Sequence, residues 1–364
     1  VTDAIYQYSL VTGDNQILKD LYSELKENYI EWKKEKFIPE TGLFWQTDNR
    51  DGMEISIGGN GFRATINSYM AAEAAILSRI AEWKNDPQAK TLKEEAEKLK
   101  NNLFKKLWDQ DAEFLKVLPQ ETNARLQNVR ELHGYTPWAF DLADPEYAVA
   151  WKYLMDTRYF LAPYGPTTAE QCHPEFKVVY EGHECQWNGP SWPYSTSMTL
   201  TGLSNLLNNQ VQPFIFSSDY VTLLTIYARS QYRRKDNGTQ IPWIDENLNP
   251  FTGDWISRTI LKHRNRLPEE RGRDYNHSSF CDLIINGLVG IRPQEGNRLD
   301  INPLVLEGHW DYFCLDNVSY HGRTICVLYD KTGEKYNKGT GLSIFIDGQK
   351  VASSPTLKRI SCEL

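Results

Sequence analysis

The spacing of apolar residues changes once along this chain, near residue 297, and this change limits the folds that it can adopt. Before this point apolar side chains recur every three to four residues, as over residues 62–83. After it they alternate with polar residues, as over residues 342–346. The first spacing predicts amphipathic helices and the second predicts strands. We therefore expect a mainly α fold over residues 1–292 and a small antiparallel, β-sandwich-like domain over 297–364.

Long polar segments separate several of the expected helices. We predict helices at residues 15–35, 62–83, 87–108, 145–155, 191–208, 213–232 and 277–290. The segments 38–61, 160–189 and 233–258 are long for connections, and loops of such length are often functional. Helices joined in turn by short and long connections indicate an (α/α)6 toroid of helical hairpins, with the long loops gathered at one end.

The beginning of the chain already has the pattern of a helix. Residues 1–12 carry apolar residues at helical spacing up to Gly13, and the chain starts at Val1. Fewer helices are predicted than six hairpins require. We therefore expect that the toroid is incomplete at its N-terminus and that a further N-terminal segment of the same protein belongs to it.

Composition excludes several classes of protein. The chain has 364 residues and a net charge of −8, without a run rich in Lys and Arg. No apolar run approaches the length of a membrane span. We expect neither a nucleic-acid partner nor a membrane partner.

The six cysteines lack the spacing of a zinc site. A disulfide between Cys172 and Cys185 and buried free thiols remain alternatives, so the cellular compartment stays open. A secreted or periplasmic location is slightly favoured over a cytoplasmic one. His173, Glu181, His183 and Glu184 are irregularly spaced, so we expect no metal site.

Residues 241–258 contain the first candidate for a site. Asp245 and Glu246 are adjacent, and the Asn, Pro and Gly residues after them indicate a loop. Trp243 and Trp255 flank them. Carboxylates between flat apolar rings suit a sugar site, where rings pack on pyranose faces and carboxylates act on the glycosidic bond. A polar surface loop anchored by two buried tryptophans is the structural alternative.

The segment 246–253 reads Glu-Asn-Leu-Asn-Pro-Phe-Thr-Gly. It resembles the Glu-x-(Tyr/Leu)-(Asn/Asp)-Pro-x-Thr-Gly segment of glycoside hydrolase family 63. That family contains processing α-glucosidases and mannosylglycerate hydrolase-like enzymes, and it belongs with the trehalases among the six-hairpin glycosidases. The resemblance implies that Glu246 is the general base that activates water.

A second segment resembles another motif of these families. Gly52-Met53-Glu54-Ile55-Ser56 is similar to Ser-Gly-(Met/Trp)-Asp-x-Ser, whose aspartate is the general acid. The resemblance therefore implies that Glu54 is the acid. Glu in place of Asp displaces the carboxyl by about 1 Å, a distance that matters in an active site. Asp51 is the alternative acid, and solvated loop charges are the structural alternative.

Residues 186–193 resemble the Tyr-Trp-Arg-Gly-Pro-x-Trp segment that lines the sugar pocket of the same families. Asn188 stands where the family has arginine. The resemblance implies a pocket wall made of Trp45, Trp187, Trp192 and Trp243. It also implies hydroxyl contacts from Arg63, Gln186 and Asn188. A structural junction between loop and helix is the alternative.

Together the three motifs imply an inverting, exo-acting α-glycoside hydrolase that acts on an oligosaccharide or small glycoside. Glu54 and Glu246 should then stand about 6.5–9.5 Å apart, which leaves room for a water molecule. No cofactor is expected. Two alternatives remain: another α-toroid enzyme, such as a polysaccharide lyase or unsaturated uronide hydrolase, for which Arg63 would bind the uronate, and an inactive glycan-binding module.

Overall fold

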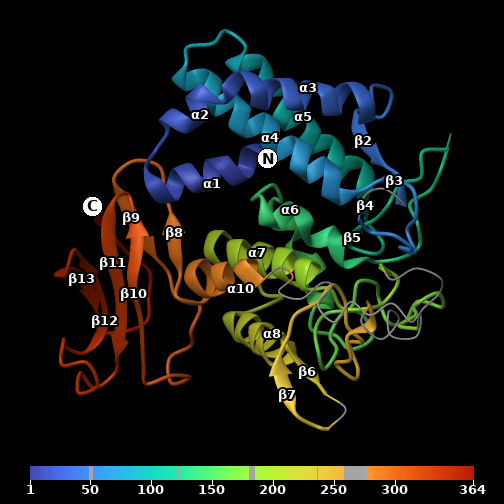
Figure 1. Cartoon of the computed structure of the whole chain (residues 1–364). Helices are drawn as coiled ribbons and strands as arrows, with labels where there is room; N and C mark the ends of the chain where they lie inside the picture. The colour runs from blue at the N-terminus through green and yellow to red at the C-terminus, as the bar shows by residue number, and fades with distance from the viewer. Residues whose placement is uncertain (49–51, 122, 180–184, 236, 258–274, 276) are drawn as a thin grey trace. The chain divides into compact units, whose positions relative to one another are not determined.

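The computed structural model describes residues 1–48, 52–121, 123–179, 185–235, 237–257, 275 and 277–364 (Figure 1). Its helices lie before residue 290, and antiparallel sheets follow them, as the change in apolar spacing predicts. The chain forms two compact units. The first comprises Val1–Tyr29, Glu73–Lys93 and Cys281–Leu364, and the second comprises Ile30–Ala72 and Glu94–Phe280. None of the described helices is long and apolar enough to cross a membrane.

Most of the helices lie where their apolar spacing predicts them. The described α-helices are α1 (Thr2–Thr12), α2 (Gln16–Asp20), α3 (Tyr22–Lys36), α4 (Ala64–Trp83), α5 (Ala89–Leu107), α6 (Thr136–Ala139), α7 (Pro193–Asn209), α8 (Ser217–Ser230) and α10 (His277–Asp282). The described residues also form the 3-10 helices η2 (Leu132–Tyr135) and η3 (Pro145–Tyr153) and a π-helical segment, η4 (Leu283–Leu288).

Two of the helix predictions need correction. The helix expected at 15–35 is divided into α2 and α3 at Leu21. Its apolar residues keep helical spacing across this break, so the pattern could not reveal it. Residues 145–153 form a 3-10 helix instead of an α-helix. Ala148, Trp151 and Leu154 are buried at intervals of three residues, which suits the three residues per turn of a 3-10 helix.

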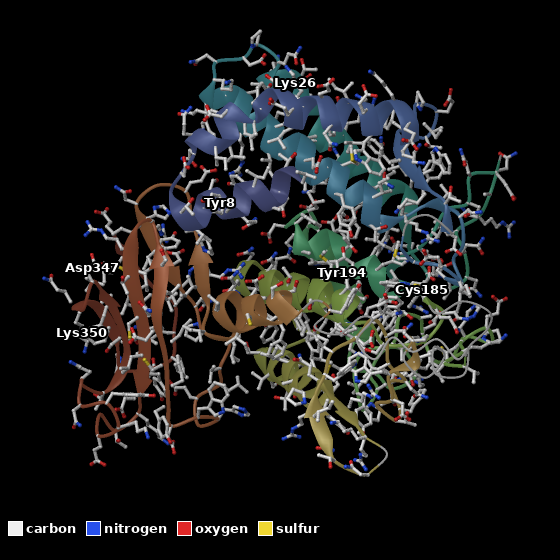
Figure 2. All side chains as sticks on the ribbon, in the orientation of Figure 1. Tyr8, Lys26, Cys185, Tyr194, Asp347 and Lys350 are labelled. Carbon is white, nitrogen blue, oxygen red and sulfur yellow. The ribbon has the colours of Figure 1, made fainter. Side chains whose placement is uncertain are left out.

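The first unit contains two antiparallel sheets. Strands β10 (Tyr312–Tyr320), β11 (Arg323–Asp330), β12 (Gly341–Ile346) and β13 (Gln349–Ser354) form one sheet in that order. The other has the order β14 (Ile360–Glu363), β9 (Arg298–Ile301), β8 (Ile291–Pro293). Ile325, Val327 and Ile344 are buried, as their alternation predicts. Asp347, labelled in Figure 2, and Gly348 both have positive φ in the turn between β12 and β13, which confirms the predicted hairpin.

In the second unit, helix α7 packs against α6, α8 and η2 (Figure 1). Helix α6 and η2 contribute to an aromatic cluster in which the ring of Trp151 is 4.3 Å from Tyr135 and 5.5 Å from Trp138. Asn205 of α7 donates hydrogen bonds to the carbonyls of residues 138 and 139. These contacts fix the position of α7, and with it the side chains of its first two turns.

The described residues of the second unit also form short antiparallel sheets. One has the order β1 (Phe37–Ile38), β2 (Leu43–Gln46), β3 (Gly61–Phe62). Strand β4 (Trp108–Asp109) pairs with β5 (Phe114–Leu115), and β6 (Tyr232–Arg234) pairs with β7 (Gln240–Pro242). Strands β2 and β3 bound the loop that carries the expected acid.

Candidate active site

The second unit contains a pocket of about 250 Å³. This volume is at the small end of the range for ligand pockets, which suits a single sugar ring better than a long polymer. Its walls come from β2, the loop before β3, α4, η2, α6, the segment before α7, and α7 itself. The described lining residues are Gln46, Gly52, Met53, Thr65, Tyr69, Leu132, His133, Thr136, Trp187, Tyr194, Ser195, Met198, Thr199 and Tyr275.

The three long loops predicted from the sequence meet beside this pocket. The Trp187 N–H donates to the Glu54 carbonyl at 3.1 Å, which joins the first loop to the second. The Tyr164 N–H donates to the Pro250 carbonyl at 2.9 Å, which joins the second loop to the third. The expectation that these loops lie together is confirmed.

Glu246 lies half-buried on the loop after β7. The Cys185 thiol is 3.8 Å from its Oε2. Its backbone N–H donates to Asp245 Oδ1 at 2.8 Å, so the buried Asp245 holds the loop. Burial and, after it, the Glu246 carboxylate raise the pKa of Tyr275 to about 12. Because Tyr275 lines the pocket, Glu246 acts electrostatically on the pocket wall, although it is not itself a lining residue.

Glu54 follows the lining residue Met53. Its Oε2 is buried and has no hydrogen-bond partner among the described residues. Glu54 contacts the backbone of Trp187, and Glu246 contacts the thiol of Cys185. The backbone of Glu54 and the carboxylate of Glu246 thus both contact the short segment 185–187. Asp51, the alternative acid, lies outside the described residues.

Arg63 is fully buried beneath the loop that carries Glu54. Its Nη2 donates to Asp48 Oδ1 and to Ser56 Oγ, each at 2.7 Å, and its Nε donates to the Gly59 carbonyl at 3.0 Å. These bonds direct the guanidinium into the loop, and Arg63 does not line the described pocket. The structure therefore gives Arg63 a part in shaping the loop.

Trp187 lines the pocket and stacks on Trp192, with ring centres 4.6 Å apart. The Trp192 Nε1–H donates to the Gln186 carbonyl at 2.7 Å. The Gln186 amide donates to the Val179 carbonyl at 2.9 Å and to Asn188 Oδ1 at 3.3 Å. Gln186 and Asn188 are both buried, so they fix the shape of this loop behind Trp187.

Trp45, Trp192 and Trp243 are not among the residues that line the described pocket. Successive residues of a strand point to opposite faces, so Gln46 faces the pocket and Trp45 faces away, below the Lys36 ammonium at 4.6 Å. The ring of Trp243 lies under the Arg233 guanidinium at 5.1 Å. Their direct contact with a sugar remains a prediction.

Several lining residues were not predicted. Tyr69 and Tyr194 share a hydrogen bond of 3.1 Å between their hydroxyls. Figure 2 marks Tyr194 on the first turn of α7 and Cys185 on the loop before it. Tyr69 lies on a helix whose apolar spacing predicts a core position, and His133 lies in a stretch that reads as irregular. Gln46 was missed because Trp45, its neighbour on β2, was expected at the pocket, and successive strand residues point to opposite faces.

The described cysteines are all free thiols, so the disulfide alternative for Cys172 and Cys185 does not hold. Among the described residues no group of His, Cys, Asp and Glu is placed to hold a metal ion. Residues 181, 183 and 184, considered above as ligands, lie outside the described residues.

Comparison with known proteins identifies the family. The model of the mannosylglycerate hydrolase MGH1-like glycoside hydrolase domain matches residues 1–278. The model of the C-terminal domain of glycosyl hydrolase family 65 matches residues 291–353. The resemblance to family 63 seen in the sequence motifs is confirmed.

Two solved structures are similar to this chain. One named "Sialidase" is 39% identical over 100% of this chain, with a TM-score of 0.90, and the chain spans 32% of its length. A family 63 mannosylglycerate hydrolase from Thermus thermophilus, solved with glucose, is 15% identical with a TM-score of 0.51. The match covers 75% of this chain and 71% of that one, and it shows a likeness of fold. The chain belongs to the mannosylglycerate hydrolase MGH1-like family of glycoside hydrolases.

Proposed function

We propose that this chain carries the active site of an inverting, exo-acting α-glycoside hydrolase built on an (α/α)6 toroid. Glu246 is the general base and Glu54 the general acid. The observation that carries the proposal is that the Glu54 backbone and the Glu246 carboxylate both contact the segment 185–187, whose Trp187 lines a pocket of about 250 Å³. A small pocket, unlike an extended groove, favours removal of one terminal sugar.

The chemistry divides between the two carboxylates. Glu246 removes a proton from a water molecule as the water attacks the anomeric carbon, and Glu54 protonates the departing oxygen on the other face of the sugar. The buried Glu54 Oε2, which has no partner among the described residues, is available to that oxygen. Trp187 offers a flat apolar surface for the sugar ring. These steps require no cofactor.

A neutral sugar suits this pocket better than an anionic one. No Arg or Lys is among the residues that line the described pocket, and Arg63 is engaged by the acid loop. This disfavours a uronate-specific lyase or hydrolase. It also disfavours sialic acid, although the similar structure that is three times as long carries the name "Sialidase". We therefore propose a neutral glycoside as the substrate of the whole protein.

The acid and the base can be separated by substrates with different leaving groups. We expect Glu246→Gln to lower kcat about 10²–10⁴-fold on every substrate, because each one requires the activated water. Glu54→Gln should lower it by a similar factor on unactivated glycosides only. Glycosyl fluorides, which need little protonation, should remain substrates. The measurement is the steady-state hydrolysis of a panel of α- and β-glycosides, with NMR of the first anomer formed.

Asp51→Asn is the matched control for the acid. If that variant shows the dependence on leaving group and Glu54→Gln does not, the acid is Asp51. Near-normal turnover by Glu246→Gln, or retention of anomeric configuration, would contradict the mechanism. An inactive glycan-binding module would bind sugars and hydrolyse none of the panel.

A further inference from the structure

Gln46 and His133 are two of the polar residues that line the pocket without a part in the mechanism above. Gln46 projects from β2, and His133 projects from η2. One end of each side chain is held by hydrogen bonds. Those bonds determine which chemical group each side chain has left to offer.

The orientation of the Gln46 amide follows from its partners. The Thr65 hydroxyl is 2.7 Å and the Ile66 backbone N–H 3.3 Å from Gln46 Oε1. A backbone N–H can only donate, so the amide oxygen must face Ile66. The Gln46 NH₂ group, which has no partner among the described residues, is then the end left for the pocket. Gln46 presents a donor.

The His133 ring is held by the buried Glu131. His133 Nε2 lies 3.0 Å from Glu131 Oε2, and the Gly58 N–H donates to Glu131 Oε1 at 3.1 Å. Gly58 approaches so closely that a Cβ at this position would stand 2.3 Å from Glu131 Oε2. The loop that carries Glu54 is thus closed against Glu131, and Glu131 is a positioning residue for both Gly58 and His133.

The ionisation of Glu131 determines the tautomer of His133. Burial by itself would raise the pKa of Glu131, but its interactions with His133, the nearby Arg63 charge and the Gly58 N–H together hold it below its usual value. An ionised carboxylate only accepts hydrogen bonds, so His133 Nε2 carries a proton. Whenever the ring is neutral, Nδ1 is therefore an acceptor. This nitrogen is buried and has no partner among the described residues.

We propose that Gln46 and His133 form a donor–acceptor pair that selects sugars by their hydroxyl groups. The Gln46 NH₂ donates to one hydroxyl oxygen, and His133 Nδ1 accepts the hydrogen of a hydroxyl group. The ligand class is a neutral pyranose with free neighbouring hydroxyls. The inference rests on the proposed function and specifies how that site chooses its sugar.

This selectivity has an energetic reason, which is the unpaired His133 Nδ1 in the site without ligand. A buried acceptor without a partner is costly, and a ligand hydroxyl relieves that cost. A sugar that lacks this hydroxyl leaves Nδ1 unpaired. Sites built to bind a hydroxyl therefore discriminate strongly against the deoxy analogue. An apolar pocket wall would not give this selectivity.

The experiment measures binding of free monosaccharides, which cannot be hydrolysed, to the whole chain labelled with ¹⁵N-histidine. The probes are D-glucose, D-mannose and D-galactose, followed by the monodeoxy derivatives of the one that binds most tightly. In the free protein, His133 Nδ1 should show the chemical shift of an unprotonated nitrogen, and binding should move it. Removal of a hydroxyl that forms a hydrogen bond with Gln46 or His133 should weaken binding about tenfold or more.

Two variants separate this role from a structural one. His133→Gln keeps an amide near the position of Nε2, within reach of Glu131, and loses the Nδ1 acceptor. Gln46→Glu keeps the oxygen that faces Ile66 and replaces the donor by an acceptor. Each variant should bind the parent sugar about tenfold more weakly. For each variant there should be one deoxy sugar, the one that lacks the hydroxyl contacted by the replaced side chain, that binds variant and wild type equally well. General disruption of the pocket would instead weaken the binding of every sugar.

The proposal is wrong if no sugar of the panel moves the His133 Nδ1 resonance, or if every monodeoxy sugar binds the wild type as tightly as its parent. If His133→Gln does not fold, the binding of the monodeoxy sugars to the wild type is sufficient to test the proposal. Failure here leaves the hydrolytic mechanism standing, because that is tested by turnover of Glu54 and Glu246 variants. Conversely, loss of that mechanism would not alter the binding of free sugars.

Discussion

At the scale of single residues, Tyr275 reports on the charge of Glu246. Burial and the Glu246 carboxylate raise its pKa to about 12, and Glu54 is not among the groups that shift it. We expect Glu246→Gln to lower the pKa of Tyr275, because the phenolate would no longer face a carboxylate. Glu54→Gln is the matched control and should leave the pKa unchanged.

The measurement is a pH titration of ¹³C-labelled tyrosine by NMR, with the Tyr275 signal assigned through Tyr275→Phe. Part of the shift should persist in Glu246→Gln, since burial is its larger cause. An equal or larger change in Glu54→Gln would mean that the two carboxylates have been placed on the wrong sides of the pocket.

Single residues also show how far sequence motifs can identify a site. Glu54, Trp187 and Glu246 were predicted for the site because each belongs to a segment with a recognisable order of residues. Gln46 and His133 belong to no such segment. Their proposed role in sugar binding depends on residues far away in sequence, such as the Glu131–Gly58 hydrogen bond. A sequence motif does not show which end of a side chain already has a hydrogen-bond partner, as Gln46 has in Ile66.

At the scale of elements, the ends of β12 depend on two glycines for different reasons. Gly348, in the turn after β12, has a φ of 80°, and a Cβ there would have no neighbour within 4 Å. Gly341, the first residue of β12, has a φ of 84°, and a Cβ there would stand 2.2 Å from the Ser354 carbonyl oxygen. The first position tests backbone strain alone, and the second adds a steric clash.

We expect Gly348→Ala to destabilise the fold by about 1–2 kcal/mol, the cost of a left-handed conformation for an L-residue. Gly341→Ala should cost more, because β13 and the segment after it must also move. Urea unfolding of both variants gives the comparison. Equal losses would show that β12 and β13 are not paired as described at Ser354.

Local signals explain which elements the sequence could predict. The Asp347-Gly348 hairpin was predictable, since the turn itself requires residues that tolerate positive φ. The break at Leu21 and the 3-10 form of residues 145–153 were not, because buried residues at intervals of three or four fit more than one helical geometry. The number of residues per turn in such a helix depends on the side chains that pack against it, here the aromatic cluster around Trp151.

At the scale of the whole molecule, several carboxylates have a pKa below its usual value. Burial works against this at Glu131 and Asp300, but hydrogen bonds and ion pairs outweigh it. Asp300, for example, pairs with Arg298 and Arg359, each at 2.7 Å. At Asp347 the Thr324 N–H and the exposed Arg323 lower the pKa. Each of these groups favours the folded state only while it is ionised.

The direction of the pH effect follows from this. The ordinary pKa values are 4.5 for Glu131 and 3.8 for the aspartates, and the folded values are lower. Between the two values the unfolded chain binds more protons than the folded one, so acidification favours unfolding. The stabilisation is complete above the ordinary pKa and is lost as the pH falls through the folded value. We therefore expect the unfolding midpoint to decline below about pH 4.5.

Two variants divide this effect between interior and surface. Glu131→Gln should destabilise the protein by about 1–3 kcal/mol at pH 7, because Gly58 and His133 lose a charged acceptor. The difference from the wild type should narrow as the pH falls, and added salt should hardly alter it, since buried groups are poorly screened. Asp347→Asn should cost much less, as for other surface pairs, and salt should reduce its effect further. Thermal unfolding from pH 7 to pH 3, at low and high salt, measures both. A stability difference between Glu131→Gln and the wild type that stayed constant across this pH range would show that Glu131 is not ionised in the folded protein. The tautomer assigned to His133 would then also be wrong.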